Sequence, residues 1–108
     1  MPTDLKPLDV LEDPYGRLRV VLAVGLPRDA WSKRYQHVLS RDGCRYVQIN
    51  MVRGQPKSAG KIRECSEGTL RQWGKPAPAW RARSARAAAV EEIRVAKAQG
   101  WIGGCDAD

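Results

Sequence analysis

Phenylalanine is absent from this sequence of 108 residues, histidine occurs once, and none of the three cysteines forms a C-x-x-C pair. One imidazole and scattered thiols do not supply the ligand spacing of a zinc site or a disulfide framework. We therefore expect no metal, and cysteines that are buried and reduced. Because phenylalanine is missing, we expect much of the large-residue packing to come from Trp31, Trp73, Trp80 and Trp101.

Long hydrophobic runs are missing as well. The first apolar stretch, residues 20–26, is far shorter than the roughly 20 residues that span a membrane. The residues before it are acidic, so we expect no secretory signal, no membrane partner and a cytoplasmic location. With 43% hydrophobic and 29% charged residues, the chain (1–108) is predicted to be one small basic domain whose residues 1–7 and 103–108 fray.

What the sequence does contain is an excess of positive charge, +7 in total. Residues 17–63 carry a net charge of +9, whereas residues 1–16 carry −3 and residues 64–108 carry +1. Such an imbalance informs the choice of partner rather than the fold. It favours a polyanion such as nucleic acid, or an acidic protein.

Alternating apolar residues predict several short strands. Residues 8–12 and 17–24 form a predicted hairpin, because the DPYG at 13–16 between them is a strong turn signal. Residues 44–52 predict a further strand, and residues 61–65 a short edge strand. On one face of the second strand we expect Leu18, Val20, Leu22 and Val24, and on one face of the strand at 44–52 we expect Val47, Ile49 and Met51.

Two other segments are less regular. SEGTLRQW, residues 66–73, predicts one helical turn. Residues 28–40 leave two interpretations open: the alternation in RYQHVLS (34–40) favours a strand, whereas helical spacing favours a short helix. The residues at that helical spacing are Trp31, Tyr35, Val38 and Leu39.

The most regular stretch is SARAAAVEEIRVAKAQG, residues 84–100. Ser84 suits a helix N-cap, and Gly100 suits the left-handed position after the last turn. One narrow stripe of this helix consists of Ala82, Ala85, Ala89, Ile93 and Ala96. Small residues let a helix lie close to a sheet. The predicted fold class is α+β: a small antiparallel sheet of four to five strands, in hairpins, packed by one C-terminal α-helix.

A basic loop is predicted at residues 53–61, RGQPKSAGK. It resembles a phosphate-binding P-loop, but five residues separate its glycines and Ile62 stands where Ser or Thr would hold magnesium, so we do not expect a nucleotide triphosphatase. Two interpretations remain: a mobile basic loop that contacts a nucleic-acid backbone, or an ordinary solvated hairpin loop. The candidate contacts, which we call the Lys57 group, are Arg53, Lys57, Lys61 and Arg63.

A second set of cations lies on the predicted helix. The Arg83 group consists of Arg83, Arg86, Arg94 and Lys97. These side chains could lie along phosphates, or they could simply occupy the solvated flank of the helix, with Glu91 pairing with Arg94. Trp73 and Trp80 flank Lys75 and Arg81, so either indole could stack on an unpaired base, or both could belong to the core.

Catalytic signatures are missing. His37 has no nucleophile or orienting acid that the sequence identifies, and there is no G-x-S-x-G. Glu91 and Glu92 are adjacent, so on a helix they point about 100° apart and do not converge as a catalytic pair. We therefore expect no enzyme activity, no catalytic residue and no cofactor.

The leading hypothesis is a small protein that binds DNA or RNA non-enzymatically through backbone phosphates. The Lys57 and Arg83 groups would contact the phosphates, with Trp73 and Trp80 available for stacking. The alternative is a protein-interaction module, such as an inhibitor or accessory factor from a phage or other mobile element, that docks on a larger acidic partner.

One family resemblance concerns about a third of the chain. Trp73-Gly74-Lys75, followed by a helix ending KAQGW at 97–101, resembles the latter part of a WGR domain, a nucleic-acid-associated module of a β-sheet and a helix. Lys75 stands where that family usually has arginine, and the gap to the helix is short. Because of these departures, the resemblance assigns neither the fold nor any site residue.

Overall fold

The structure is a computed structural model that describes residues 5–26 and 43–104. The two interpretations of residues 28–40, and the prediction for His37, lie outside the described residues. Residues 1–4 and 105–108, at the two predicted frayed ends, lie outside them too.

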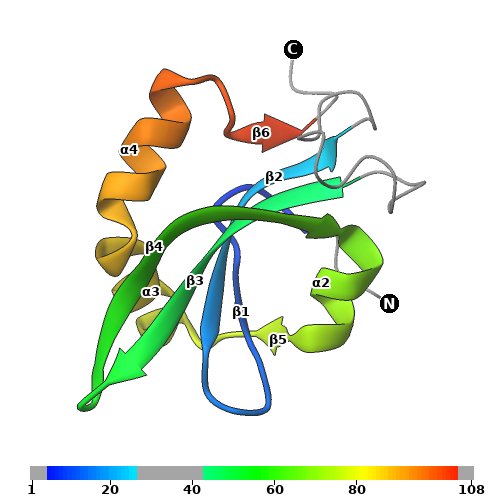
Figure 1. Cartoon of the computed structure of the whole chain (residues 1–108). Helices are drawn as coiled ribbons and strands as arrows, with labels where there is room; N and C mark the ends of the chain where they lie inside the picture. Colours follow the sequence, from blue (N-terminus) through cyan, green and yellow to red (C-terminus); the bar gives the residue numbers. More distant parts are fainter. Residues whose placement is uncertain (1–4, 27–42, 105–108) are drawn as a thin grey trace.

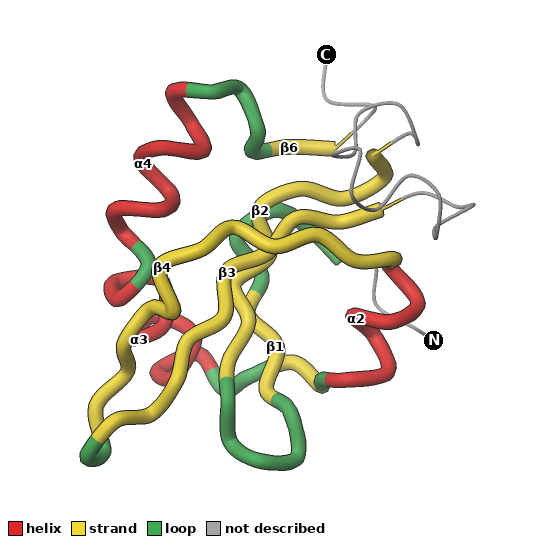
Figure 2. The backbone as a smooth tube through the Cα atoms, viewed as in Figure 1, coloured by secondary structure: helices red, strands yellow, loops and turns green. Residues whose placement is uncertain are grey.

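A single sheet organises the described residues (Figures 1 and 2). Its strands are β1 (Val10–Glu12), β2 (Leu18–Leu26), β3 (Gly43–Val52), β4 (Gln55–Ser66) and β5 (Lys75–Pro76), in the order β4-β3-β2-β1-β5. Neighbours in this order are antiparallel. The short β6 (Gly103–Gly104), expected to belong to a frayed tail, pairs in parallel with β2 at Ala23 and Val24.

The prediction of an α+β fold is confirmed, but the prediction of one helix is wrong. The described residues contain α2 (Glu67–Trp73), α3 (Ala79–Ala88) and α4 (Val90–Ala98). The single helix predicted over residues 84–100 is wrong: the chain forms α3 from Ala79 and, after Ala89, α4 from Val90. Helix α3 begins before Ser84 because Pro78 takes the N-cap position and proline is tolerated at a helix start. The Ser84 hydroxyl instead donates to the carbonyl of Trp80, at 3.2 Å.

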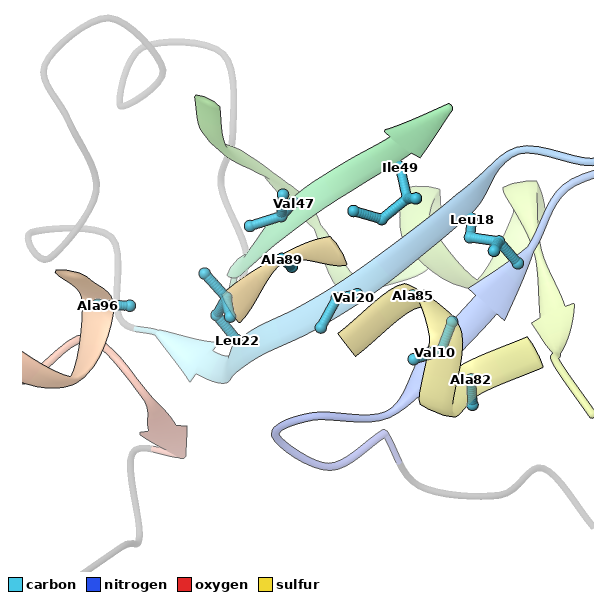
Figure 3. Packing of buried hydrophobic residues seen from close by; sticks show 10 residues of the cluster. All are labelled: Val10, Leu18, Val20, Leu22, Val47, Ile49, Ala82, Ala85, Ala89 and Ala96. Atoms are coloured by element: carbon cyan, nitrogen blue, oxygen red, sulfur yellow. The ribbon is translucent and has the colours of Figure 1, made fainter. Parts of the chain in front are cut away.

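One face of the sheet is packed by α3 and α4 (Figure 3). The predicted alanine stripe is confirmed, since Ala82, Ala85, Ala89 and Ala96 are buried there and Ile93 packs beside them. The strands contribute Val10, Leu18, Val20, Leu22, Val47 and Ile49 to this covered face. Small helical residues allow the helices to lie close to these branched side chains, which produces a dry layer.

Of the four tryptophans, Trp31 lies outside the described residues, and the other three contribute less to the core than expected. The largest fully buried side chains are Leu18, Leu22, Ile49 and Leu70. By contrast, Trp73 and Trp80 are 44% and 66% exposed, and Trp101 is half-buried against the core. Within the described residues, leucine and isoleucine side chains therefore supply most of the large buried volume of the core.

The opposite face of the sheet holds a second apolar cluster, packed by α2. It consists of Leu11, Val21, Cys44, Tyr46, Cys65 and Leu70, and Leu5 and Val24 pack against it. Val24 was expected to share a face with Leu22. A register shift between β2 and β3 after Val21 breaks the alternation, so Val24 joins this second cluster. Met51, expected on the same face as Val47 and Ile49, is 40% exposed near the end of β3, whereas those two side chains are fully buried.

The predicted loop at 53–61 is mostly strand. β3 and β4 are joined by a two-residue turn at Arg53 and Gly54, whose φ angles are 53° and 79°. Two positive φ angles are typical of the tight turns that connect antiparallel strands. Glycine, proline and serine suggested a loop, but β4 is an edge strand, where Pro56 removes no essential ladder hydrogen bond. The predicted edge strand at 61–65 is confirmed as part of β4.

Candidate functional site

Beyond the part packed by α2, the same face of the sheet carries polar side chains. Arg19 is paired with Gln48 across β2 and β3, and Tyr46 is paired with Arg63 across β3 and β4. Paired residues on neighbouring strands share a face. Asn50 joins them, because its side-chain oxygen accepts a hydrogen bond from the Gln48 amide at 2.9 Å. We call the surface formed by Arg19, Gln48, Asn50 and Arg63 the open face.

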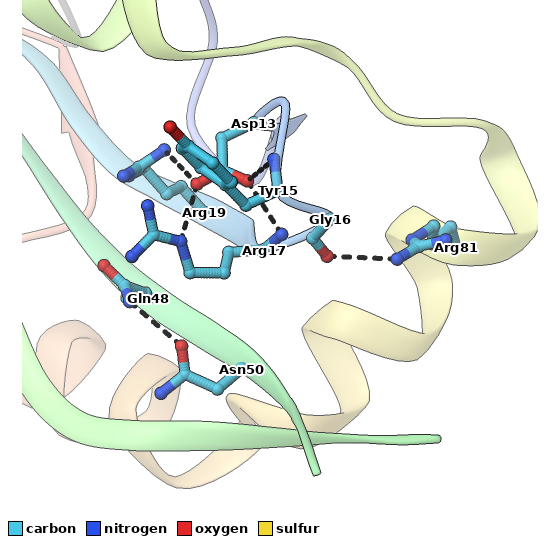
Figure 4. Close-up of polar contacts among 8 residues, drawn as sticks. All are labelled: Asp13, Tyr15, Gly16, Arg17, Arg19, Gln48, Asn50 and Arg81. Atoms are coloured by element: carbon cyan, nitrogen blue, oxygen red, sulfur yellow. Dashed lines mark hydrogen bonds and ion pairs between the residues drawn. The ribbon is translucent and has the colours of Figure 1, made fainter. Parts of the chain in front are cut away.

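The turn between β1 and β2 borders the open face and is organised by Asp13 (Figure 4). The carboxylate of Asp13 is buried and accepts hydrogen bonds from the backbone N–H groups of Tyr15 (2.9 Å) and Arg17 (2.8 Å) and from Arg17 Nε (2.7 Å). Burial opposes ionisation, but the hydrogen bonds from Arg17 and Tyr15 outweigh it and lower the pKa of Asp13. The carboxylate therefore stays charged at neutral pH and holds the turn.

Arg19 is the least expected member of the site. Its side chain is only 6% exposed, and its Nη1 lies 3.6 Å from Oδ2 of Asp13. The guanidinium carbon lies 4.8 Å from the centre of the Trp73 ring and 5.8 Å from that of Tyr46. Its Nε and Nη1 are buried without a hydrogen-bond partner among the described residues. Unsatisfied donors on a buried guanidinium are uncommon, and an acceptor that the described residues do not supply would explain them.

A pocket of about 420 Å³ opens next to this arginine. Its lining residues are Asp13, Pro14, Tyr15, Arg17, Arg19, Tyr46, Gln48, Arg63, Gln72 and Trp73. Two rings are accessible to solvent, since Tyr15 is 83% exposed and Trp73 is 44% exposed. The pocket thus combines aromatic walls, a recessed cation and amide groups.

The local sequence explains why Trp73 stands over Arg19. Ser66 caps α2, and its hydroxyl accepts the N–H of Thr69 at 3.1 Å. The helix ends at Gly74, where a Cβ would lie 2.8 Å from the Cβ of Leu11. The backbone after α2 therefore passes closer to β1 than any side chain would permit, and Trp73 is positioned beside β2.

The Lys57 group lies partly on the open face. Lys57 is paired with Asn50, and Arg63 lines the pocket. Lys61 is exposed in a bulge of three β4 residues that oppose Gln48, and Arg53 is exposed in the turn. Among the described residues, no hydrogen bond or ion pair neutralises these four cations.

The Arg83 group lies on the helices that pack the opposite face. Arg86 donates from Nη1 to the carbonyl of Leu8 at 3.0 Å, and Arg94 forms an ion pair with Glu91. Arg83 and Lys97 are exposed. The structure therefore separates the Lys57 and Arg83 groups by the sheet. Trp80, near the start of α3, does not line the pocket.

The sequence reasoning missed Tyr15, Arg17, Arg19 and Gln48 as site residues. For Asp13 it left two roles open, turn chemistry or a counter-charge for the basic residues 17–63, and the structure shows both, since Asp13 holds the turn and pairs with Arg17 and Arg19. The signal was available in the alternation of the strands. Arg17 and Arg19 flank Leu18, and Gln48 and Asn50 flank Ile49. Once the apolar members of two paired strands are assigned to a core, the intervening polar members must meet on the other face.

Cys44 and Cys65 face each other across β3 and β4 as buried free thiols. Burial raises the pKa of Cys44 to about 12 and that of Cys65 to about 11. Both thiols are therefore protonated at neutral pH and are poor nucleophiles.

Two further findings concern the described residues. None of their helices combines the length and apolar character that crossing a bilayer requires. Within the same residues, no group of three or more His, Cys, Asp and Glu side chains could hold a metal ion. Comparison with known proteins adds no assignment: no family model, no curated protein and no solved structure matches the chain.

Proposed function

We propose that the protein binds nucleic acid non-enzymatically, through the open face and the adjoining Lys57 group. The observation that carries the proposal is the position of uncompensated cations beside exposed aromatic rings on one face of the sheet. Lys57 and Arg63 have no carboxylate partner among the described residues, and Trp73 and Tyr15 stand at the pocket that Arg63 lines.

The physical basis is the release of counterions. Each cation that neutralises a phosphate releases condensed ions, so affinity falls steeply as salt rises. Arginines already paired with carboxylates contribute less, because their charge is compensated within the protein. Arg94 is such a residue, and Arg86 is bonded to the carbonyl of Leu8, so the Arg83 group has fewer cations available for phosphates than the Lys57 group.

The test is a titration of mixed-sequence 12-nucleotide DNA, single-stranded and duplex, at several KCl concentrations. Lys57→Gln/Arg63→Gln is expected to flatten the plot of log K against log salt by roughly 1.5, since two phosphate contacts are lost. The matched control is Arg83→Gln/Lys97→Gln, which removes the same charge from the helices. We expect its slope to stay close to that of the wild type.

If both double variants flatten the slope equally, binding follows net charge and the open face is not the site. If no variant and no wild-type protein binds either DNA in dilute salt, the proposal is wrong.

A second candidate function, docking on an acidic protein, is favoured by a different observation. Val90 and Trp80 are 65% and 66% exposed on the helices that cover the other face. Tryptophan is enriched among the anchor residues of protein interfaces, so the exposed indole of Trp80 is a candidate contact. This candidate gains support if nucleic-acid binding is absent, and Val90→Asp would then be expected to abolish capture of the partner.

A further inference from the structure

We infer that the pocket lined by Trp73 and Arg19 holds one unpaired base, so that the protein prefers single-stranded to duplex nucleic acid. This inference rests on the proposed function and adds to it the form of nucleic acid that is bound. It is carried by the shape and chemistry of the pocket rather than by net charge.

Trp73 supplies an aromatic wall of the pocket. Trp73 is almost half exposed, and the Arg19 guanidinium lies against its ring, at 4.8 Å from the ring centre. That guanidinium holds one side of the indole and leaves its exposed part available to a ligand. A flat base can stack on such a ring whatever its sequence, because every base has a π-face.

Arg19 supplies a positively charged group to the same pocket. The Arg19 side chain is nine-tenths buried and lines the pocket, and its Nε and Nη1 donate no hydrogen bond to a described residue. Its charge is only partly balanced, by Asp13 at 3.6 Å, because Arg17 holds the same carboxylate at 2.7 Å. Base edges and phosphates offer the acceptors that a guanidinium lacks here, and arginine binds such acceptors strongly.

The pocket suits a single strand better than a duplex. In a duplex the bases are stacked on each other and paired, so their faces are not available to a ring on a protein surface. A recessed pocket of about 420 Å³ has room for a single small molecule rather than for the rounded edge of a duplex. A single strand can place one base in the pocket while its flanking phosphates reach Arg63 and, farther along the same face, Lys57.

The test compares Trp73→Ala with Trp80→Ala, which deletes an equally large indole outside the pocket. The probe is the same 12-nucleotide DNA, single-stranded and duplex, with thermal unfolding as the check on folding. Wild-type protein is expected to bind the single strand about tenfold more tightly than the duplex. Trp73→Ala is expected to lose about that factor for the single strand, with an unchanged salt slope, and Trp73→Phe to recover most of it.

Trp80→Ala is expected to bind like the wild type. The inference is overturned if single strand and duplex bind equally well, or if the two alanine variants lose the same affinity. In that case a weakened Lys57→Gln/Arg63→Gln variant still supports the proposed function. Absence of binding to both DNAs overturns the inference and the proposed function together.

Discussion

The two faces of the sheet are made from the same strands and have opposite characters. On the covered face, Leu18 and Ile49 pack against the alanines of α3 and α4. On the open face, their neighbours Arg19 and Gln48 line a polar pocket, while α2 packs the adjoining apolar part and places Trp73 over Arg19. In a strand, successive side chains point to opposite faces of the sheet. Neighbouring residues in the sequence can therefore belong to an apolar core on one face and a charged site on the other.

The arrangement is possible because the buried charge on the open face is supported locally. Asp13 partly balances the charge of Arg19, and the rings of Tyr46 and Trp73 lie against its guanidinium. Cation–π contacts of this kind stabilise a partly desolvated arginine. The open face is therefore expected to depend on a few electrostatic contacts, whereas the covered face depends on packing volume.

The largest expected effect tests this difference at two adjacent positions of β3. Ile49→Ala removes a fully buried side chain from the covered face and should lower the free energy of unfolding by about 3 kcal/mol, through lost burial and a cavity. Asn50→Ala, on the open face, should cost about 0.5 kcal/mol, because its side chain is half-buried and makes one hydrogen bond. Urea unfolding measures both. Equal losses would mean that the open face is also a packed core.

The next effect concerns Asp13. Asp13→Ala leaves Arg19 without its carboxylate and two backbone N–H groups without an acceptor, so a loss of about 2–3 kcal/mol is expected. Glu12→Ala is the control, since Glu12 pairs with Arg81 at 3.7 Å and is less deeply buried. Its loss should be about 1 kcal/mol or less. A similar loss in both variants would show that the buried charge on the open face is not specially dependent on Asp13.

The pH dependence of stability should separate the charge of Asp13 from its shape. Its pKa is lowered in the folded state, so the unfolded chain binds the proton more readily. The stabilisation is therefore complete above the ordinary value of 3.8 and is lost as the pH falls below it, toward the folded-state pKa. The difference in unfolding free energy between wild type and Asp13→Asn should shrink in acid. A difference that is constant from about pH 6 to pH 2 contradicts this account.

Sequence reasoning was more successful on the covered face than on the open face. The alanine stripe and Gly100 have strong local signatures, so the helix and its packing residues could be predicted. The two-residue turn at Arg53 and Gly54 could not, because glycine, proline and serine signal a longer loop unless the pairing of β3 with β4 is already known. The pocket depends on two pairings at once, of Arg19 with Gln48 and of α2 with the sheet, and no local pattern encodes such long-range contacts.

The smallest expected effects concern two glycines at helices on opposite sides of the sheet. Neither Gly68 in α2 nor Gly100 after α4 has an atom within 4 Å of an added Cβ, so alanine would clash at neither position. Gly100 has a φ of +73° and closes α4, with its N–H bonded to the carbonyl of Lys97 at 3.1 Å. Gly100→Ala should therefore cost about 1 kcal/mol, from backbone strain alone.

Gly68 lies within a helix, where alanine is favoured over glycine. Gly68→Ala should stabilise the protein by about 0.5 kcal/mol, because the unfolded chain loses conformational freedom and α2 gains a better helix former. In thermal unfolding, the melting temperature of Gly68→Ala should therefore rise and that of Gly100→Ala should fall. If both variants lower the melting temperature, packing contacts at Gly68 outweigh the helix propensity of alanine. In that case α2 and the open face are more closely packed than we expect.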